Sequence, residues 1–224
     1  MVRRKKIPLL SACCLILSLD LARAQTQDFH LGKVTQANGV VTFLEYSPPH
    51  KLSEVSTGGL VLGTGSYLTQ ENANFTAKLF DGTWLRASPR TKFALEFNPD
   101  NKSLTLNLLT GSVKVLFAPL LSDKRVTTFL IRSADAVFES SEAKFTVVRN
   151  ILTSETSLFV EKGVVNARLN GPMEGKDSVV VHAREMTSLK DRTSDFQSPK
   201  QMGERQMKFL NSAFYLGGKT DQSF

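Results

Sequence analysis

The sequence has almost no cysteine, and the two cysteines that it contains, Cys13 and Cys14, lie near its start. Both fall inside a segment that has the features of a cleavable export signal. We therefore expect a mature chain without cysteine, which excludes disulfide bonds, thiol nucleophiles and cysteine-ligated zinc. An exported domain of this kind has to be stabilised by its apolar core alone.

Histidine is also scarce, and no catalytic motif compensates for it. The three histidines, His30, His50 and His182, have no second histidine or carboxylate at the i, i+4 spacing of a helical metal site. No G-x-S-x-G motif marks a serine nucleophile. Acidic residues that could bind calcium only if loops converged are interpreted as solvated loop residues: Asp135, Glu139, Glu142 and Glu155. We predict a protein that is not an enzyme, with no catalytic residues, no cofactor and no metal site.

Long apolar runs are missing except at the start of the chain. Four basic residues at positions 3–6 precede an apolar stretch over residues 7–19, and Ala22-Arg23-Ala24 precedes Gln25. This order predicts a signal peptide over 1–24, ordinary Sec export and a periplasmic or secreted mature chain. No later run approaches the roughly 20 apolar residues of a membrane span, so no transmembrane segment is expected. Lipidation at Cys13 is the less favoured route, because too short an apolar stretch precedes it.

The basic character of the chain lies largely in this leader. Removal of five basic residues and one acidic residue lowers the formal charge from +7 to +3. A weak positive charge favours approach to anionic surfaces such as cell-wall polymers or lipid headgroups. Together with export, it gives no reason to expect a nucleic-acid partner.

The rest of the sequence is typical of consecutive β-strands. Between Phe75 and Phe117, runs of alternating or β-branched residues are broken by Asp81-Gly82, Ser88-Pro89, 98–101 and Thr110-Gly111, which predicts a meander of hairpins. Asn38-Gly39 predicts another hairpin, and Asp81-Gly82 a two-residue turn in which Asp81 is structural.

The second half of the chain has the same style. Its Val160-x-x-Gly163-x-β run echoes Leu109-x-Gly111-x-Val113 in the first half. We predict an all-β domain over residues 25–192, built as a twisted sandwich or a solenoid-like stack of hairpins.

The C-terminal region, 193–224, is expected to hold a linker, one α-helix and a flexible tail. Ser198-Pro199-Lys200-Gln201 resembles a capping box, and Met207, Leu210 and Phe214 recur at helical spacing. We predict a helix near 199–215, which either docks on the sheet or binds a partner or a membrane surface.

The order and spacing of these motifs resemble the FecR-type periplasmic domain, over roughly residues 32–190. The resemblance implies an all-β periplasmic module, in a family whose founding members relay transporter occupancy to a cytoplasmic sigma factor. A leader here replaces the transmembrane helix of those regulators, so a stand-alone exported member is expected. The motifs that carry the resemblance are Leu60-x-x-Gly63-x-x-x-x-Leu68-Thr69, Ala77-x-Leu79-x-Asp81-Gly82-x-x-Leu85, Leu106-x-x-Leu109-x-Gly111-x-Val113-x-Val115, Phe145-x-Val147 and Val160-x-x-Gly163-x-Val165.

The candidate binding residues are Trp84, Arg86 and Arg90. Two interpretations follow: an interaction or signalling module that binds another envelope protein, or a binder of peptidoglycan or another polysaccharide. For the second, Trp84 would stack on sugar rings together with Tyr46 and Tyr67. The commoner structural roles are buried packing for the aromatic residues, and a solvated face for the basic stripe of Arg86, Arg90 and Lys92.

Overall fold

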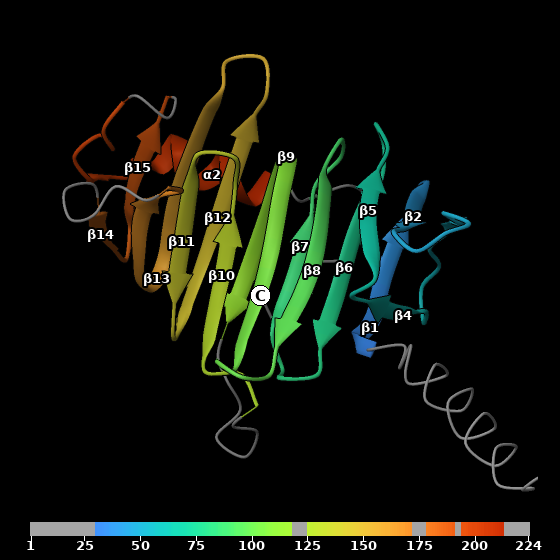
Figure 1. Ribbon diagram of the computed structural model, residues 1–224. Coiled ribbons are helices and arrows are strands. Elements are labelled where there is room, and N and C mark those ends of the chain that lie inside the picture. The colour runs from blue at the N-terminus through green and yellow to red at the C-terminus, as the bar shows by residue number, and fades with distance from the viewer. Residues whose placement is uncertain (1–29, 118–124, 172–177, 191–193, 213–224) are drawn as a thin grey trace, which may run out of the picture.

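The computed structural model describes residues 30–117, 125–171, 178–190 and 194–212, and nearly all of its regular structure is β (Figure 1). The predictions of an all-β domain and of one helix near the C-terminus are confirmed. The elements are β1 His30–Asn38, β2 Val41–Glu45, β3 Leu52–Glu54, β4 Leu60–Leu62, β5 Gly65–Thr69, β6 Asn74–Leu79, β7 Trp84–Ala87, β8 Lys92–Asn98, β9 Ser103–Phe117, β10 Thr128–Arg132, β11 Ala136–Ser140, β12 Ala143–Asn150, β13 Glu155–Leu169, β14 Ser178–His182, β15 Glu185–Leu189, β16 Lys200–Gln201 and α2 Glu204–Ser212.

The strands form two layers that share their longest members. Sheet A has the order β4-β1-β6-β7-β9-β12-β13-β15-β16, and sheet B has the order β3-β2-β5-β8-β9-β10-β11-β13-β14. Neighbouring strands are antiparallel except β9 and β10, which are parallel. The apolar residues that alternate along both sheets meet between them, as in a sandwich of two half-buried sheets.

The two shared strands change sheet at a glycine. In β9, residues up to Thr110 pair in sheet B and residues from Gly111 pair in sheet A. In β13 the change of sheet falls at Gly163. Both glycines have positive φ, 89° and 83°, a conformation that side chains with a Cβ rarely adopt. The repeated apolar-x-x-Gly pattern therefore marks the corners of the sandwich.

The chain also turns a corner at Asn38-Gly39, so the hairpin predicted there is wrong. β1 pairs with β4 and β6, β2 pairs with β3 and β5, and the two strands do not pair with each other. Gly39 has φ 71°. The positive φ that suits a tight hairpin also suits a strand that bends into the second layer, and local sequence does not separate the two. Ser88-Pro89 is a corner for the same reason, since β7 and β8 lie in different sheets.

Two of the predicted turns in the meander are hairpins. One is the 98–101 turn, which joins the paired strands β8 and β9. The other joins β6 and β7, but its loop spans Phe80, Asp81 and Gly82, closed by Leu79 N–H donating to Thr83 O at 2.8 Å. Asp81 accepts hydrogen bonds from the Thr83 N–H and hydroxyl at 3.0 and 2.6 Å, which confirms its turn role.

Aromatic rings fill the core between the sheets. Tyr67 lies 4.9 to 5.3 Å, centroid to centroid, from its three neighbours Phe43, Phe75 and Phe93. Its hydroxyl accepts a hydrogen bond from Leu62 N–H at 2.6 Å. Burial raises the pKa of Tyr67 to about 12, although the hydrogen bond to Leu62 lowers it. Tyr67 is therefore part of the core.

Helix α2 is shorter than predicted. Lys200 and Gln201 pair with β15 as β16, because a proline at position 199 and an extended chain before it favour strand geometry. The helix begins after Gly203, whose N–H donates to the Gln206 side chain at 3.0 Å. The predicted Ser198 capping box is therefore wrong, and the predicted tail lies outside the described residues.

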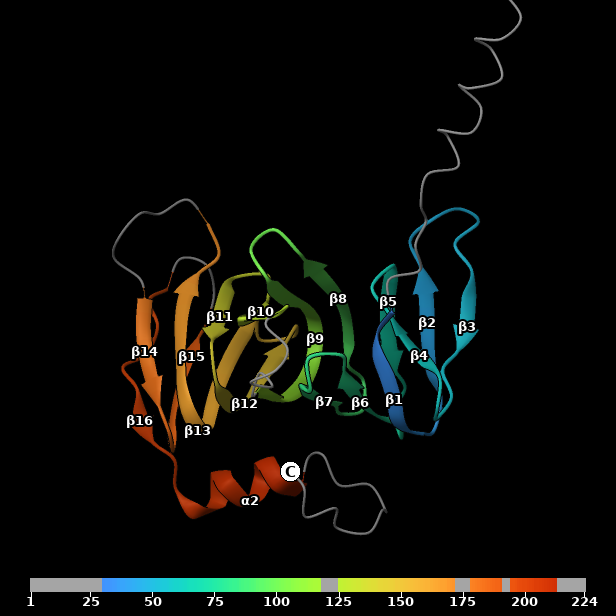
Figure 2. The same cartoon turned by 90° about the horizontal axis from the view of Figure 1, so that it is seen from below.

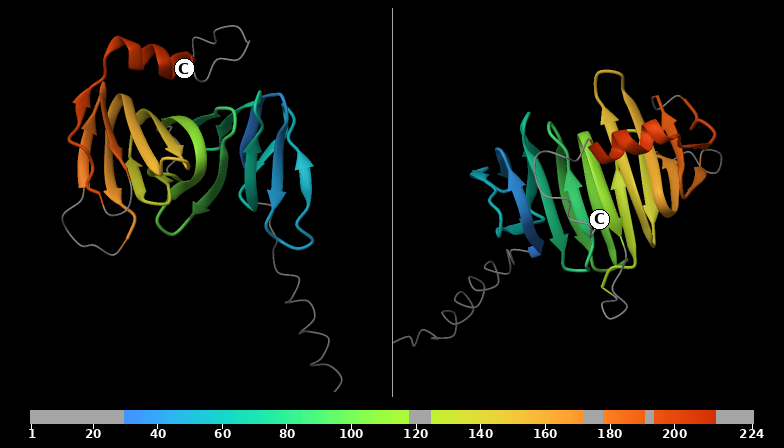
Figure 3. Two further views of the ribbon diagram at one scale, coloured as in Figure 1. Left: turned by 90° about the horizontal axis from the view of Figure 1, so that it is seen from above. Right: turned by 180° about the vertical axis from the view of Figure 1, so that it is seen from behind.

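Helix α2 lies outside the sandwich, along the outer face of sheet A over β12 and β13 (Figures 2 and 3). Its Leu210 is 1% exposed, whereas the adjacent Phe209 is 58% exposed. Burial of one apolar side chain fits a helix that rests on the sheet in cis. Part of the outer face of sheet A is thereby covered.

Candidate interaction face

The outer face of sheet A carries a row of mostly basic residues. Side chains alternate between the two faces of a strand, so residues paired in register share a face. One such row crosses the sheet as Lys33, Lys78, Trp84, Leu116, Lys144 and Lys162. Of these, Lys33, Lys78 and Lys162 are exposed, and Trp84 is half-buried. We call this row, together with Arg86, Lys114 and Glu161, the basic face.

A second row lies beside the first and is largely buried. It runs Thr76, Arg86, Lys114, Thr146 and Phe159 across β6, β7, β9, β12 and β13. Lys114 is 5% exposed and Thr146 is fully buried. Arg86 is half-buried, so it is the member of the second row that solvent reaches most easily.

A single carboxylate faces these cations within the two rows. Glu161 lies at a β-bulge opposite Lys144, with its Oε1 2.7 Å from the Lys114 Nζ and its Oε2 3.3 Å from the Lys144 Nζ. The Glu161 carboxylate therefore pairs with two ammonium groups. Together with the other cations, this leaves the basic face with an excess of positive charge. Such a surface attracts acidic groups and repels basic ones.

Trp84 shares its face with a lysine. The Lys78 Nζ lies 5.6 Å from the centroid of the Trp84 ring, the geometry of a cation–π contact. The strand pair β6–β7 fixes this contact, since Lys78 and Trp84 are register partners. One exposed lysine and one half-buried aromatic ring thus stand together at the centre of the open row.

The buried Lys114 gives the face a pH-dependent effect on stability. Burial lowers the pKa of Lys114 below its usual 10.5, and Glu161 opposes this shift only in part. Between the folded-state pKa and 10.5 the unfolded chain binds more protons than the folded chain. The contribution of Lys114 to the free energy of unfolding therefore rises with pH in that window.

Comparison with a variant isolates this effect. We expect Lys114→Met to lack this rise, so that wild type gains stability relative to the variant as pH increases from 7 toward 10.5. Urea unfolding at a series of pH values measures it, with Lys33→Met, an exposed lysine of the same sheet, as the control. A wild-type-minus-variant difference that is flat or falls with pH would contradict the assignment.

The structure separates the residues that the sequence grouped together. Trp84 and Arg86 lie on the basic face, but Arg90 lies at the corner between the sheets, where it is exposed and paired with Glu71. Lys92 belongs to β8 in sheet B. The predicted basic stripe of Arg86, Arg90 and Lys92 is therefore wrong, because β7 and β8 form a corner and not a hairpin.

The proposed sugar-stacking group also does not assemble. Tyr67 is 1% exposed in the core and Tyr46 lies in the loop after β2, at 52% exposure, so neither forms a platform with Trp84. Sequence reasoning missed Lys78, Lys114, Lys144 and Glu161 as members of one face. Alternation along each strand was visible in the sequence, but the strand order that joins β6, β7, β9, β12 and β13 was not.

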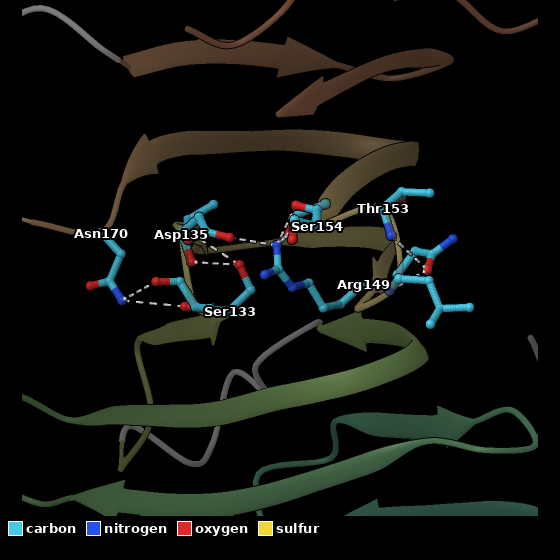
Figure 4. A network of polar contacts seen from close by, with 11 residues as sticks. Ser133, Asp135, Arg149, Thr153, Ser154 and Asn170 are labelled. Carbon is cyan, nitrogen blue, oxygen red and sulfur yellow. Dashed lines mark hydrogen bonds and ion pairs between the residues drawn. The ribbon is translucent and has the colours of Figure 1, made fainter. Parts of the chain in front are cut away.

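Asp135, one of the loose acidic group, has a structural role. Its Oδ2 lies 2.5 Å from the Arg149 Nη1, and both side chains are buried (Figure 4). The same nitrogen donates to the Ser154 carbonyl at 2.8 Å and the Thr156 hydroxyl at 2.9 Å. Asn170 donates to the Ser133 carbonyl at 3.2 Å, next to this pair. The network ties the loop before β11 to the β12–β13 hairpin.

In the part of the chain that the structure describes, no three His, Cys, Asp or Glu side chains gather in an arrangement that could hold a metal ion. His30, His50 and His182 lie on β1, in the loop after β2 and at the end of β14. Among the described residues, no helix has the length and apolarity needed to cross a membrane.

Comparison with known proteins gives a likeness in fold. No family model matches the sequence, and no curated protein matches it. Two crystal structures of "a putative anti-sigma factor" from Parabacteroides distasonis ATCC 8503 resemble it, with TM-scores of 0.53 and 0.52 at 12% and 11% identity. The matches cover 65% and 64% of this chain, and 64% and 62% of those chains. The chain thus spans less than two thirds of either neighbour, and at this identity the likeness concerns the fold alone.

Proposed function

We propose that the chain is a non-catalytic, exported interaction module of the FecR type, which binds an acidic surface of another cell-envelope protein through the basic face. The observation that carries the proposal is the cationic row on sheet A. Its exposed members, Lys33, Lys78 and Lys162, stand beside a half-buried tryptophan, and one carboxylate faces the cluster. A basic surface with a central aromatic residue suits a protein partner of opposite charge.

The fold likeness supports a role in regulation or interaction. Both similar structures are described as "a putative anti-sigma factor", and anti-sigma factors are a signalling class. The leader predicted over residues 1–24 favours an envelope location, because a basic segment, an apolar stretch and Ala22-Arg23-Ala24 follow in the order of an export signal.

Charge reversal tests the proposal. We expect the combined variant Lys78→Glu and Lys162→Glu to reduce co-purification of a dominant envelope protein at least tenfold, because each substitution replaces attraction by repulsion. The measurement is quantitative mass spectrometry of proximity-crosslinked complexes from cells that express the exported chain. Raising ionic strength should weaken the wild-type complex in the same direction.

The matched control is Arg168→Glu, which reverses an exposed charge on β13 in sheet B. Equal loss with this control, or full retention by the double variant, would refute binding through the basic face. Sedimentation with purified sacculi tests the polysaccharide interpretation, since a glycan binder would sediment with the cell wall without a protein partner.

A further inference from the structure

The outer face of sheet B carries a polar cleft at the end of the β8–β9 hairpin. Its volume is about 480 Å³, which lies within the roughly 300–1,000 Å³ of small-molecule sites. Glu96 of β8, Thr105 of β9 and Arg132 of β10 line it, together with the turn over residues 98–101. The cleft and the basic face therefore belong to different sheets, and the proposed function makes no use of the cleft.

Strand register places these three side chains on one face. Thr105 pairs with Glu96 on one side and with Leu130 on the other, and Arg132 follows Leu130 by two residues. Residues two apart on a strand share a face, as register partners do. Leu104, the residue before Thr105, is fully buried in the core between the sheets. Thr105, Glu96 and Arg132 therefore all point to the outside of sheet B, and their side chains form the floor of the cleft.

Thr105 is a nearly buried polar residue whose hydroxyl has no partner in the protein. Its exposed fraction is 7%, and the hydroxyl makes no hydrogen bond with any described residue. The nearby Ser103, 5% exposed, instead donates its hydroxyl to the Asn101 Oδ1 at 2.6 Å. A buried hydroxyl costs free energy unless it is hydrogen-bonded. Thr105 thus supplies an uncommitted donor and acceptor in the floor of the cleft.

The charged groups of the cleft are one cation and two carboxylates. The Arg132 guanidinium is exposed and makes no ion pair with a described residue. The Glu96 Oε1 accepts from the Asn107 Nδ2 at 2.8 Å, and no described residue engages its other oxygen. Asp100 is exposed in the turn. A molecule that complements this set carries one carboxylate and one or two ammonium groups.

The turn that lines the cleft is held by its own side chains. The Asn98 Oδ1 accepts from the Asp100 N–H at 3.0 Å. The Asn101 Oδ1 accepts from the Ser103 N–H at 3.2 Å, in addition to the Ser103 hydroxyl. These bonds fix the turn without a ligand, so binding in the cleft does not have to order it.

We propose that the cleft binds a basic amino acid, which has a carboxylate at one end and a side-chain ammonium group at the other. The main chains of β8 and β10 lie roughly 10 Å apart because β9 separates them, so one extended small molecule spans the floor. Its carboxylate accepts from the Arg132 guanidinium and the Thr105 hydroxyl. Its side-chain ammonium donates to the Glu96 and Asp100 carboxylates.

The test is titration of the ¹⁵N-labelled, purified chain with L-lysine, followed by amide chemical shifts. We expect saturable shifts that are confined to β8, β9, β10 and the 98–101 turn. The diamine 1,5-diaminopentane keeps both cationic ends and lacks the carboxylate, so it should bind at least tenfold more weakly. The peptide Ala-Ala-Lys presents the same carboxylate and side chain at a peptide end. Its binding as tightly as L-lysine would identify a peptide terminus as the ligand, and weaker binding would identify the free amino acid.

Two variants test the assigned contacts. Arg132→Met should weaken L-lysine binding at least tenfold, and Thr105→Val, which keeps the β-branched shape without the hydroxyl, at least threefold. Arg168→Met is the matched control, since it removes an exposed arginine from the same face of sheet B outside the cleft and should bind like wild type. Far-ultraviolet circular dichroism checks that each variant is folded.

Three results would overturn the proposal. One is the absence of saturable shifts with wild type, and the second is wild-type affinity in Arg132→Met. The third is equal affinity for L-lysine and the diamine, because the carboxylate would then have no partner in the cleft.

Discussion

Replacing Arg149 by methionine is expected to lower the free energy of unfolding by about 3–5 kcal/mol, the usual cost of breaking a buried ion pair from one side. Arg149 and Asp135 are 8% and 6% exposed, so the substitution leaves the Asp135 carboxylate buried without its cation. The hydrogen bonds to Ser154 and Thr156 are lost with it. Urea unfolding followed by circular dichroism measures the difference.

An exposed pair provides the control. Arg90 and Glu71 have side chains that are 72% and 67% exposed, so Arg90→Met should change stability by less than about 1 kcal/mol. The double variant Arg149→Met and Asp135→Leu should recover part of the loss, because it removes both buried charges. A single variant as stable as wild type would show that the network does not hold the end of the sandwich.

Replacing Gly163 by alanine is the second large effect, and we expect it to cost roughly 2–5 kcal/mol. Its φ of 83° disfavours any residue with a Cβ, which accounts for about 1–2 kcal/mol. A Cβ at this position would also lie 2.4 Å from the Glu142 carbonyl oxygen and 2.9 Å from the Ala143 Cα. Because these contacts are main-chain atoms of the facing corner, the two sheets would have to shift.

Gly58 separates the two causes. It has a similar φ of 87°, but a Cβ there would meet nothing within 4 Å. Gly58→Ala should therefore show the conformational cost alone, about 1–2 kcal/mol. Thermal or urea unfolding of both variants gives the comparison. Equal losses in the free energy of unfolding would mean that the chain at Gly163 accommodates a Cβ without a steric cost.

The strands themselves could be predicted from the sequence, whereas the way they join could not. The alternation of Phe75, Ala77 and Leu79 predicts one buried face, and all three residues are buried in β6. Asn38-Gly39 and Thr110-Gly111 supply positive φ, but a hairpin and a corner both need it. Which one forms depends on whether the next strand adds to the same layer, and this is decided by packing far along the chain.

The basic face shows the same limit. Lys78, Lys114 and Lys144 lie on three strands and are 36 and 30 residues apart in the sequence, and only the register of β6, β7, β9 and β12 makes them neighbours. Trp84 and Arg86, predicted as an aromatic residue and a nearby cation of a binding site, are two residues apart on β7 and therefore share a face. The prediction that Arg90 lies on the same face was wrong, because the chain leaves sheet A between Ala87 and Lys92.

The predicted helix begins too early in the sequence, and the reason is local. Ser198-Pro199 has the residue types of a helix start, yet the pairing of Lys200 with Met186 keeps this segment extended. The Gly203 N–H donates to the Gln206 side chain, so this end of the helix lies five residues after the predicted Ser198 cap. Tertiary pairing overrode a valid local motif.

The most direct test of the central claim is site-specific photo-crosslinking in cells. A photoreactive amino acid replaces Lys78, an exposed residue of the basic face, and in a matched chain it replaces Leu68, 40% exposed on the outer face of sheet B. The account predicts one dominant protein adduct from position 78 and none of that adduct from position 68. An identical adduct from both positions, or none from position 78, would contradict an interaction through the basic face.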